Sequence, residues 1–369
     1  MNGTSFIKEI GRSYIVSSFL PAALFVSFGV FIFRGFVPSF ILQGVNQINS
    51  FLGLGNPENF SVAALFILFI TTSWVAFYLY SSINWTIQLY EGYKFPWLIA
   101  EVMKLYFRIT WHRKQIPIYE KRRKEFETPP SSKDIDLSEA KDIALAEIEN
   151  IEGFSPIDED DILPTRLGNV LRASECYADE RYKLNSLVMF PKLLHVLPQS
   201  FVHELEDKNN RFIFLVHSSF LSYIVGILAL SIGVFDKLLL SPICSSPLVP
   251  NWITKYLCEA GLFQNGLSLL SNTEYMFVGI FFLTVGYVLY RVSVTAAREF
   301  ALQIRASFDL YRFDLLRQLN HRLPITLNDE KQIWQLLSEY FVAGNRLRFA
   351  EVRIQYHHSE TKSERQPRE

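Results

Sequence analysis

The chain has 369 residues, of which 49% are hydrophobic and 15% are aromatic, including 32 Phe. Its formal net charge of −1 argues against a nucleic-acid or other polyanionic partner. The mean hydropathy is only +0.14 because long apolar runs alternate with charged regions, so the segregation of charge is the most informative property.

Four apolar runs predict membrane-spanning helices, because about 20 apolar residues at 1.5 Å per residue cross a hydrocarbon core of about 30 Å. The runs are roughly 14–33, 62–81, 212–235 and 275–294. They form two pairs, one within residues 1–93 and one within residues 212–294, the second with an outer loop over 236–273. The predicted fold is therefore all-α: a polytopic membrane protein with four transmembrane helices and a helical cytoplasmic domain.

Charged residues flank these runs in a way that predicts their orientation. Basic residues cluster after the second and fourth runs, whereas the outer segment 35–61 contains no Lys or Arg. By the positive-inside rule, both termini and the central region lie in the cytoplasm of a plasma or bacterial inner membrane. The first run lacks a small-residue cleavage site and predicts a retained span, in which Pro21 indicates a kink. Aromatic and basic residues mix over 103–113, which predicts a segment on the membrane surface.

The predicted spans contain uncharged polar residues and no Asp, Glu, Lys or Arg near their midpoints, which argues against an ion-coupled transporter. These residues are Ser17, Ser18, Thr71, Thr72, Ser73, Ser218, Ser219 and Ser222. They could line a pore or form hydrogen bonds between helices, and the second interpretation is the more common use of such residues. His217 predicts a satisfied or interface-facing histidine rather than a pH sensor.

The central region 94–211 predicts a cytoplasmic helical domain that includes an acidic segment at 134–161. The acidic run ending at Asp161 lacks the spacing of a calcium-binding loop, so no metal site is expected. Thr165 follows a proline and predicts a helix N-cap. Arg166, Asn169 and Arg172 have the spacing of one helix face. They could clamp an acidic partner or anion, or they could belong to a capped helix that docks on its neighbours.

Arginines recur every seven residues from the end of the fourth run into the tail region 295–358. They are Arg291, Arg298, Arg305 and Arg312, and an apolar seam of Ala297, Ala301, Ile304, Phe308, Tyr311 and Leu315 accompanies them. Both patterns predict one continuous helix. In one interpretation it is an oligomeric stalk whose arginines contact anions or lipid phosphates. In the other it packs within one subunit. The polar residues 359–369 predict a disordered tail.

The sequence contains no signature that supports an enzyme. No phosphate-binding loop, dinucleotide-binding glycine motif or zinc-binding motif is found, so no catalytic, cofactor or metal residues are assigned and no cofactor is expected. Cys244 and Cys258 share the predicted outer loop, where they could form a disulfide or remain free thiols.

Several short motifs stand out along the chain. They are Gly11-Arg-Ser-Tyr14 with Pro21, Tyr90-Glu-Gly-Tyr93, Leu163-Pro-Thr-Arg-Leu-Gly-Asn169 with Leu171, Arg172 and Glu175, and Phe308-Asp-Leu-Tyr-Arg-Phe-Asp-Leu-Leu316. Together they resemble a group of uncharacterised bacterial four-span membrane proteins with an LPTRLGN-type cytoplasmic motif. The resemblance covers most of the chain and implies a bacterial inner-membrane setting, but no activity. The layout alone is similar to that of bestrophin-type channels.

The leading functional hypothesis from the sequence is a homo-oligomeric channel or pore-like assembly in the lipid bilayer. It depends on the stalk-like helix and on the polar but uncharged spans. The alternative is a non-conducting membrane anchor or sensor that recruits a cytoplasmic protein partner.

Overall fold

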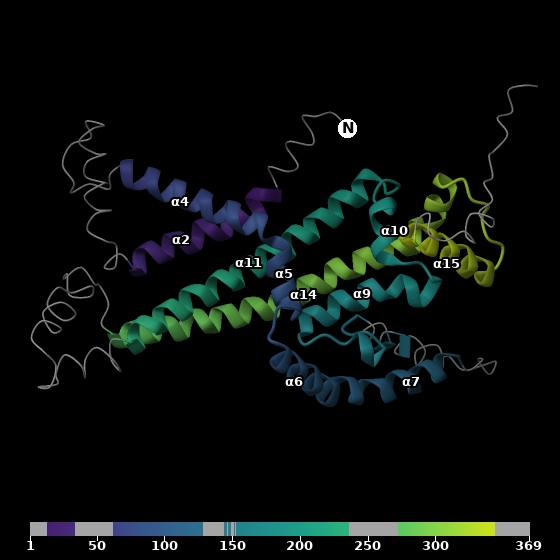
Figure 1. The fold of residues 1–369 in the computed structure, drawn as a ribbon, viewed down its shortest axis with the longest axis horizontal. Helices are drawn as coiled ribbons and strands as arrows, with labels where there is room; N and C mark the ends of the chain where they lie inside the picture. Colours follow the sequence, from purple (N-terminus) through teal and green to yellow (C-terminus); the bar gives the residue numbers. More distant parts are fainter. Residues whose placement is uncertain are drawn as a thin grey trace, which may run out of the picture. The chain divides into compact units, whose positions relative to one another are not determined.

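The computed structural model describes residues 13–33, 62–127, 144–145, 147–148, 151, 153–235 and 272–343. These residues form helices and short connections, and no β-strand occurs among them (Figure 1). The outer loop with Cys244 and Cys258, half of the acidic segment 134–161 and the tail 359–369 lie outside the described residues.

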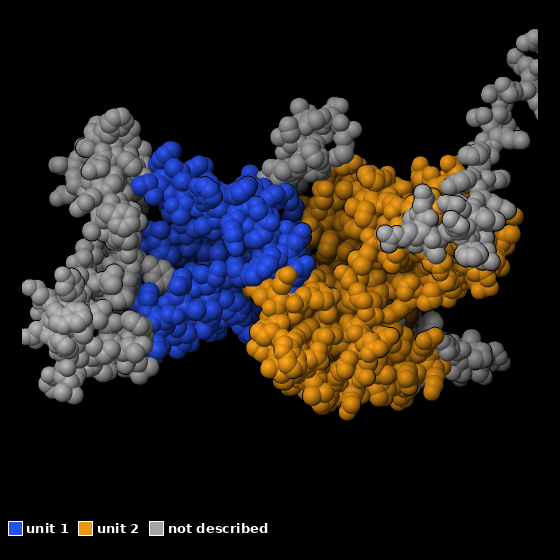
Figure 2. All heavy atoms as spheres, viewed as in Figure 1, with its two compact units in different colours: residues 1–88, 210–295 blue, residues 89–209, 296–369 orange. Residues whose placement is uncertain are grey.

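The chain divides into two compact units (Figure 2). The first unit contains residues 1–88 and 210–295, and the second contains residues 89–209 and 296–369. The division falls within three helices: α5 (Ile83–Glu91), α11 (Gln199–Phe235) and α14 (Asn272–Gln318). The two long helices α11 and α14 therefore contribute residues to both units.

Two helices, α11 and α14, are long and apolar enough to cross a membrane. The helix α4 (Val62–Ser81) and α5 are bent by 61° relative to each other and count as a third span when they are taken together. The remaining predicted span is the π-helix η1 (Ile15–Phe19) followed by α2 (Leu20–Phe33), which form a shorter apolar helix. The apolar helices thus indicate a membrane protein with two to three spans by length, not clearly the four expected.

Small residues allow the helices of the first unit to approach closely, as is common between membrane helices. A Cβ atom added at Gly279 of α14 would lie 2.5 Å from Leu230 Cγ of α11, and one added at Gly226 of α11 would lie 3.0 Å from Leu283. These pairs show that α11 and α14 run antiparallel. The helices α2 and α4 pack side by side through Ala22 and Leu79 (Figure 1).

The outward side of α4 is rich in large apolar side chains. Phe66, Phe69, Trp74, Phe77 and Tyr78 are all exposed, and the exposed fraction of Trp74 is 70%. A surface of this kind is unfavourable in water and favourable in lipid. It supports the interpretation of α4 as a membrane helix.

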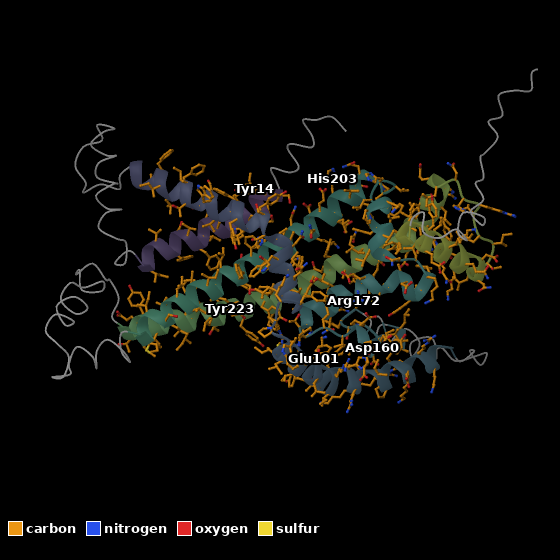
Figure 3. The ribbon with its side chains drawn as sticks, viewed as in Figure 1. Tyr14, Glu101, Asp160, Arg172, His203 and Tyr223 are labelled. Atoms are coloured by element: carbon orange, nitrogen blue, oxygen red, sulfur yellow. The ribbon has the colours of Figure 1, made fainter. Side chains whose placement is uncertain are left out.

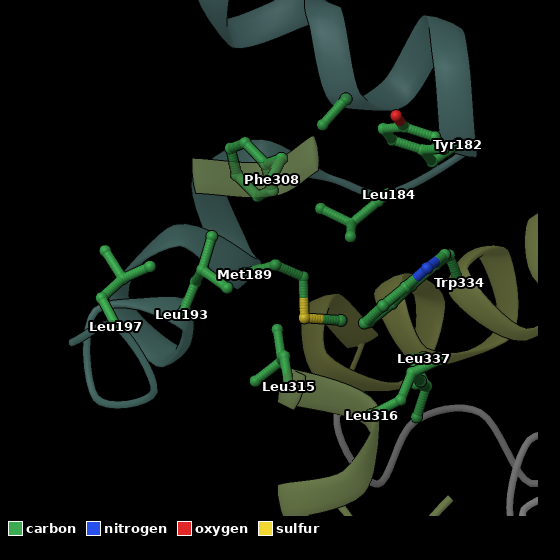
Figure 4. Packing of buried hydrophobic residues seen from close by; sticks show 11 residues of the cluster. Tyr182, Leu184, Met189, Leu193, Leu197, Phe308, Leu315, Leu316, Trp334 and Leu337 are labelled. Carbon is green, nitrogen blue, oxygen red and sulfur yellow. The ribbon is translucent and has the colours of Figure 1, made fainter. Parts of the chain in front are cut away.

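The second unit is a helical assembly around its own apolar core. Its elements are α6 (Trp97–Phe107), the π-helix η3 (Arg108–His112), α7 (Arg113–Glu127), the short 3-10 helix η4 (Glu159–Asp161), α9 (Arg166–Tyr182), α10 (Ser186–Leu193), α15 (Leu327–Ala343) and parts of α5, α11 and α14. Met189 of α10, Phe308 and Leu316 of α14 and Trp334 of α15 are buried together (Figure 4). This core holds α14 against α9, α10 and α15.

Candidate functional site

The first unit contains a histidine in an unusual backbone environment. His217 of α11 is fully buried, and its Nδ1 atom lies 2.7 Å from the carbonyl oxygen of Ser17 in η1. Pro21 has no amide hydrogen, so the carbonyl four residues earlier, that of Ser17, loses its usual α-helical donor. His217 supplies a donor instead. The predicted disturbance at Pro21 therefore takes the form of a π-helix whose free carbonyl binds a buried imidazole.

The hydrogen bond to Ser17 also fixes the chemistry of the other ring nitrogen. A carbonyl oxygen can only accept, so Nδ1 carries the hydrogen. In the neutral ring, Nε2 is then an acceptor. Nε2 of His217 is buried and has no hydrogen-bond partner among the residues that the structure describes.

Two neighbouring serines of α11 also have buried side-chain atoms without a hydrogen-bond partner among the described residues. Ser218 and Ser222 are buried, and within the described part of the chain neither hydroxyl oxygen has a partner. They lie one turn apart on one face of α11. That face lies between the face of Leu221, which packs on α2 and α4, and that of Gly226, which packs on α14. We call the buried polar residues Ser17, Ser18, His217, Ser218 and Ser222 the serine–histidine cluster, although His217, which faces η1, lies about 100° around α11 from Ser218.

Three other polar residues of the spans bond to backbone carbonyls. Thr71 and Ser73 of α4 donate to the carbonyl oxygens four residues earlier, at 2.8 Å each, and Thr71 is exposed. Ser219 donates to the carbonyl oxygen of Gly286 at 2.9 Å and thereby joins α11 to α14. The hydroxyls of Ser17 and Ser18 lie 3.3 Å apart, and Thr72 is buried.

An unpaired buried polar atom is costly, at about 1–3 kcal/mol each. The cluster offers one imidazole acceptor and two hydroxyls that can donate or accept, and it has no formal charge. Such groups can form hydrogen bonds with water or a small polar species, but they cannot neutralise a charge by ion pairing.

The arginine stripe of α14 lies in different surroundings from residue to residue. Arg291, in the first unit, is exposed. In the second unit, the guanidinium of Arg298 lies 4.3 Å from the ring centre of Phe154. Arg305 is buried and donates to the carbonyl oxygen of Ala173 in α9 at 3.0 Å.

Arg312 belongs to a hydrogen-bonded network that joins α9, α14 and α15. Its Nε atom lies 2.6 Å from the Glu330 carboxylate, and its guanidinium stacks on Tyr182. Tyr177 and Tyr182 both donate to the Asp309 carboxylate. Burial, followed by this hydrogen bond, raises the pKa of Tyr182 to about 12, so it stays a donor at neutral pH.

The apolar seam beside these arginines is covered within the chain. Ala297, Ala301, Phe308 and Leu315 are all buried. Phe308 and Leu315 belong to the core of the second unit. Of the two interpretations of this helix, the described residues show packing within one subunit for the seam and for Arg298, Arg305 and Arg312.

The proposed clamp of Arg166, Asn169 and Arg172 does not form one surface. Asn169 is fully buried, and its amide bonds the backbone of Leu163 and Thr165 through three contacts of 2.7–2.8 Å. Arg166 is exposed. Arg172, which is labelled in Figure 3, binds Asp161 and also pairs with Glu175 at 3.2 Å.

The start of α9 instead docks on the end of α5. Thr165 is the N-cap of α9, as predicted: its hydroxyl accepts from the Gly168 amide at 2.9 Å and donates to the Tyr90 carbonyl at 2.6 Å. A Cβ atom at Gly168 would lie 2.5 Å from the Glu91 carbonyl oxygen. Glycine is therefore required where the two backbones approach.

Glu91, at this junction, was not singled out from the sequence. Burial, with a smaller contribution from Glu175, raises the pKa of its carboxyl from 4.5 to about 7. Cys176 follows Glu175 in the sequence. Burial raises the pKa of its thiol to about 12, so this cysteine is protonated and unreactive. No group of three or more His, Cys, Asp or Glu that could hold a metal is found in the described part of the chain.

Sequence reasoning also missed the pairing of His217 with Ser17, although one signal was present. A proline inside an apolar run always frees the carbonyl four residues earlier, and a buried histidine on another span is a natural donor to it. Comparisons with protein-family models, curated proteins and solved structures find no match for this chain.

Proposed function

We propose that the protein is a multi-pass membrane protein of pore-like function, in which the serine–histidine cluster lines a path for a small polar or ionic solute. The observation that supports this most strongly is the set of unpaired buried atoms: His217 Nε2 and the hydroxyls of Ser218 and Ser222. The proposal includes four transmembrane helices, a bacterial inner-membrane location and both termini in the cytoplasm.

These three atoms lie in the interior of the first unit. Apolar helices surround them, and lipid offers no hydrogen bonds to an unsatisfied group. A sequence that served only as an anchor could replace Ser218 and Ser222 by alanine and avoid the cost of burying two hydroxyls. Pores, in contrast, need polar lining groups, and uncharged hydroxyls and imidazoles suffice for weak, rapid binding.

The proposal also includes a homo-oligomer. Because the α14 seam is covered within one chain, we place the contacts between copies on the exposed apolar side of the first unit. That side carries large aromatic residues such as Trp74 of α4 and Phe277 of α14. Lipid would cover the remainder of the same surface.

The test is transport by the purified full chain in lipid. Currents in potassium chloride across planar bilayers, and osmotic swelling of proteoliposomes in glycerol, probe ions and neutral solutes respectively. We expect the double variant Ser218→Ala, Ser222→Ala to reduce the active flux several-fold, because it removes hydroxyls from the path.

The matched control is the double variant Thr71→Val, Ser73→Ala, whose hydroxyls bond to their own helix. It should leave the flux unchanged. If the protein produced no current and no swelling above the level of empty vesicles, the proposed function would be contradicted. A detergent-corrected light-scattering mass equal to one chain of 42.8 kDa would contradict the homo-oligomer alone.

The alternative is a non-conducting anchor or sensor whose second unit recruits a cytoplasmic protein. It is favoured by one observation: the arginines and the seam of α14 beyond Arg291 are engaged within the second unit rather than available to a conduit. The absence of flux, combined with retained folding of the Ser218→Ala, Ser222→Ala variant, would favour this alternative.

A further inference from the structure

The helix α6 presents its apolar side away from the second unit. Phe107 is its buried residue, whereas the side chains opposite to it are exposed. The exposed apolar residues are Leu98, Ile99, Val102, Leu105, Tyr106 and Ile109, the last at the start of η3. The exposed fractions of Val102 and Tyr106 are 67% and 69%. A helix of a water-soluble domain has the opposite arrangement.

The six residues form one continuous stripe. At about 100° per residue, they fall within roughly a third of the helix circumference. Phe107, together with the half-buried Met103, lies outside this stripe. The stripe is thus an unpartnered apolar face of α6, which we call the α6 face.

Basic side chains lie at both ends of the α6 face. Lys94 precedes α6, and Arg113 and Lys114 follow η3; all three are exposed. The one acid within α6, Glu101, is paired with Lys104 of the same helix at 3.4 Å. Cations at the two ends of an apolar stripe complement a surface with an apolar interior and anionic headgroups.

The chain connection also favours lipid as the occupant. α6 begins at Trp97, six residues after the end of α5 at Glu91, and α5 directly continues the apolar helix α4. A helix tethered this closely to an apolar run meets the membrane surface at high effective concentration. An exposed tryptophan at the first position of α6 is typical of the interface between headgroups and acyl chains.

We propose that α6 lies on the membrane surface and that its α6 face binds an anionic lipid bilayer. Lys94, Arg113 and Lys114 contact the headgroups. The predicted surface segment 103–113 covered only the second half of this face. The inference is independent of whether the first unit conducts.

The test uses the full chain in proteoliposomes, with its three cysteines replaced and one spin label introduced. Labels at Val102→Cys on the α6 face and at Glu120→Cys on exposed α7 are compared for collisions with oxygen, which concentrates in lipid, and with a water-soluble nickel chelate. In vesicles containing phosphatidylglycerol, we expect the oxygen-to-nickel ratio to be several-fold higher at position 102 than at position 120. The combination Lys94→Glu, Arg113→Glu, Lys114→Glu should remove most of that difference.

Two results would overturn the proposal. Equal nickel accessibility at positions 102 and 120 would place the α6 face in water. Low accessibility to both reagents at position 102, with an immobilised spectrum, would place it against protein, either a second copy or another partner. If the charge-reversed variant kept the same difference in oxygen-to-nickel ratio between positions 102 and 120, binding to anionic headgroups would be contradicted.

Discussion

Two buried polar residues, Asn169 in the second unit and His217 in the first, differ in how completely their hydrogen bonds are satisfied. In the second unit, the amide of Asn169 uses both of its donors and its acceptor on the backbone around Thr165. In the first unit, His217 uses one ring nitrogen, and its second nitrogen and the hydroxyls of Ser218 and Ser222 have no partner. Satisfied groups stabilise a fold, whereas unsatisfied ones persist where water or a ligand supplies the missing bonds.

This difference separates structure from function more clearly than the motifs did. The most conspicuous motif of the sequence, around Asn169, holds α9 against the end of α5. The inconspicuous serines of α11 form the candidate site. Unpaired buried atoms also occur in the second unit: the hydroxyls of Ser155 and Ser186 and Nε1 of Trp334 are examples, and Trp334 lies in the apolar core. The first-unit atoms differ in that all three lie on α11, a helix long and apolar enough to cross a membrane.

The largest effect is expected in the core of the second unit. Phe308→Ala should lower the free energy of unfolding by about 3–5 kcal/mol, because Phe308 is fully buried within the chain. Leu302→Ala, at an exposed position of the same helix, should change it by less than about 0.5 kcal/mol. Thermal unfolding in detergent measures both. Similar values for the two variants would show that the seam is not covered within one subunit.

A second large effect should follow from Asn169→Ala. The change leaves the buried N–H and carbonyl of Leu163 without partners and should cost about 3 kcal/mol. Arg166→Ala, in the same turn but exposed, is the control and should be nearly neutral. If both variants had the same melting temperature as the wild type, the hydrogen bonds of Asn169 would have no role in stability.

The junction at Glu91 predicts a pH dependence of stability. Burial raises the pKa of this carboxyl from 4.5 to about 7, so the folded state favours the protonated form. Stability should be highest below pH 4.5 and should decrease as the pH rises through about 7, as far as this group is concerned. Melting temperatures across this range should decrease less steeply for Glu91→Gln. Parallel curves for the variant and the wild type would contradict the assignment.

The smallest effects should distinguish two serines of the same helix. Ser219→Ala removes a hydrogen bond to Gly286 and should cost about 1 kcal/mol. Ser222→Ala removes a hydroxyl without a protein partner and should change stability by less than about 0.5 kcal/mol, or increase it. Chemical unfolding of the reconstituted protein measures the difference. Equal losses would mean that Ser222 has a structural partner.

The helical fold could be predicted from the sequence wherever one local signal sufficed. Continuous apolar runs predicted α4 and the apolar parts of α11 and α14, and Thr165 predicted the start of α9. The count of four spans is less clear, because the first apolar run contains Pro21, and its helix is divided into η1 and a short α2. A local sequence pattern does not distinguish a π-helix from an α-helix near a proline.

The roles of residues within the helices could not be predicted in the same way. A seven-residue spacing of arginines fits a stalk and a helix packed within one chain equally well, and the presence of α9 and α15 decides between them. Likewise, Ser219 and Ser222 are identical in type and lie on the same helix. Only the carbonyl of Gly286, distant in sequence, distinguishes them.

The central claim, that the serine–histidine cluster is open to a polar solute, is tested most directly by thiol accessibility. Single cysteines at Ser218→Cys and Ser222→Cys, in a chain without Cys176, Cys244 and Cys258, are exposed to a small charged thiol reagent in proteoliposomes. Val216→Cys, buried on the opposite side of the same helix, is the control. We predict that positions 218 and 222 react much faster than position 216. Reaction as slow as at position 216 would contradict the account.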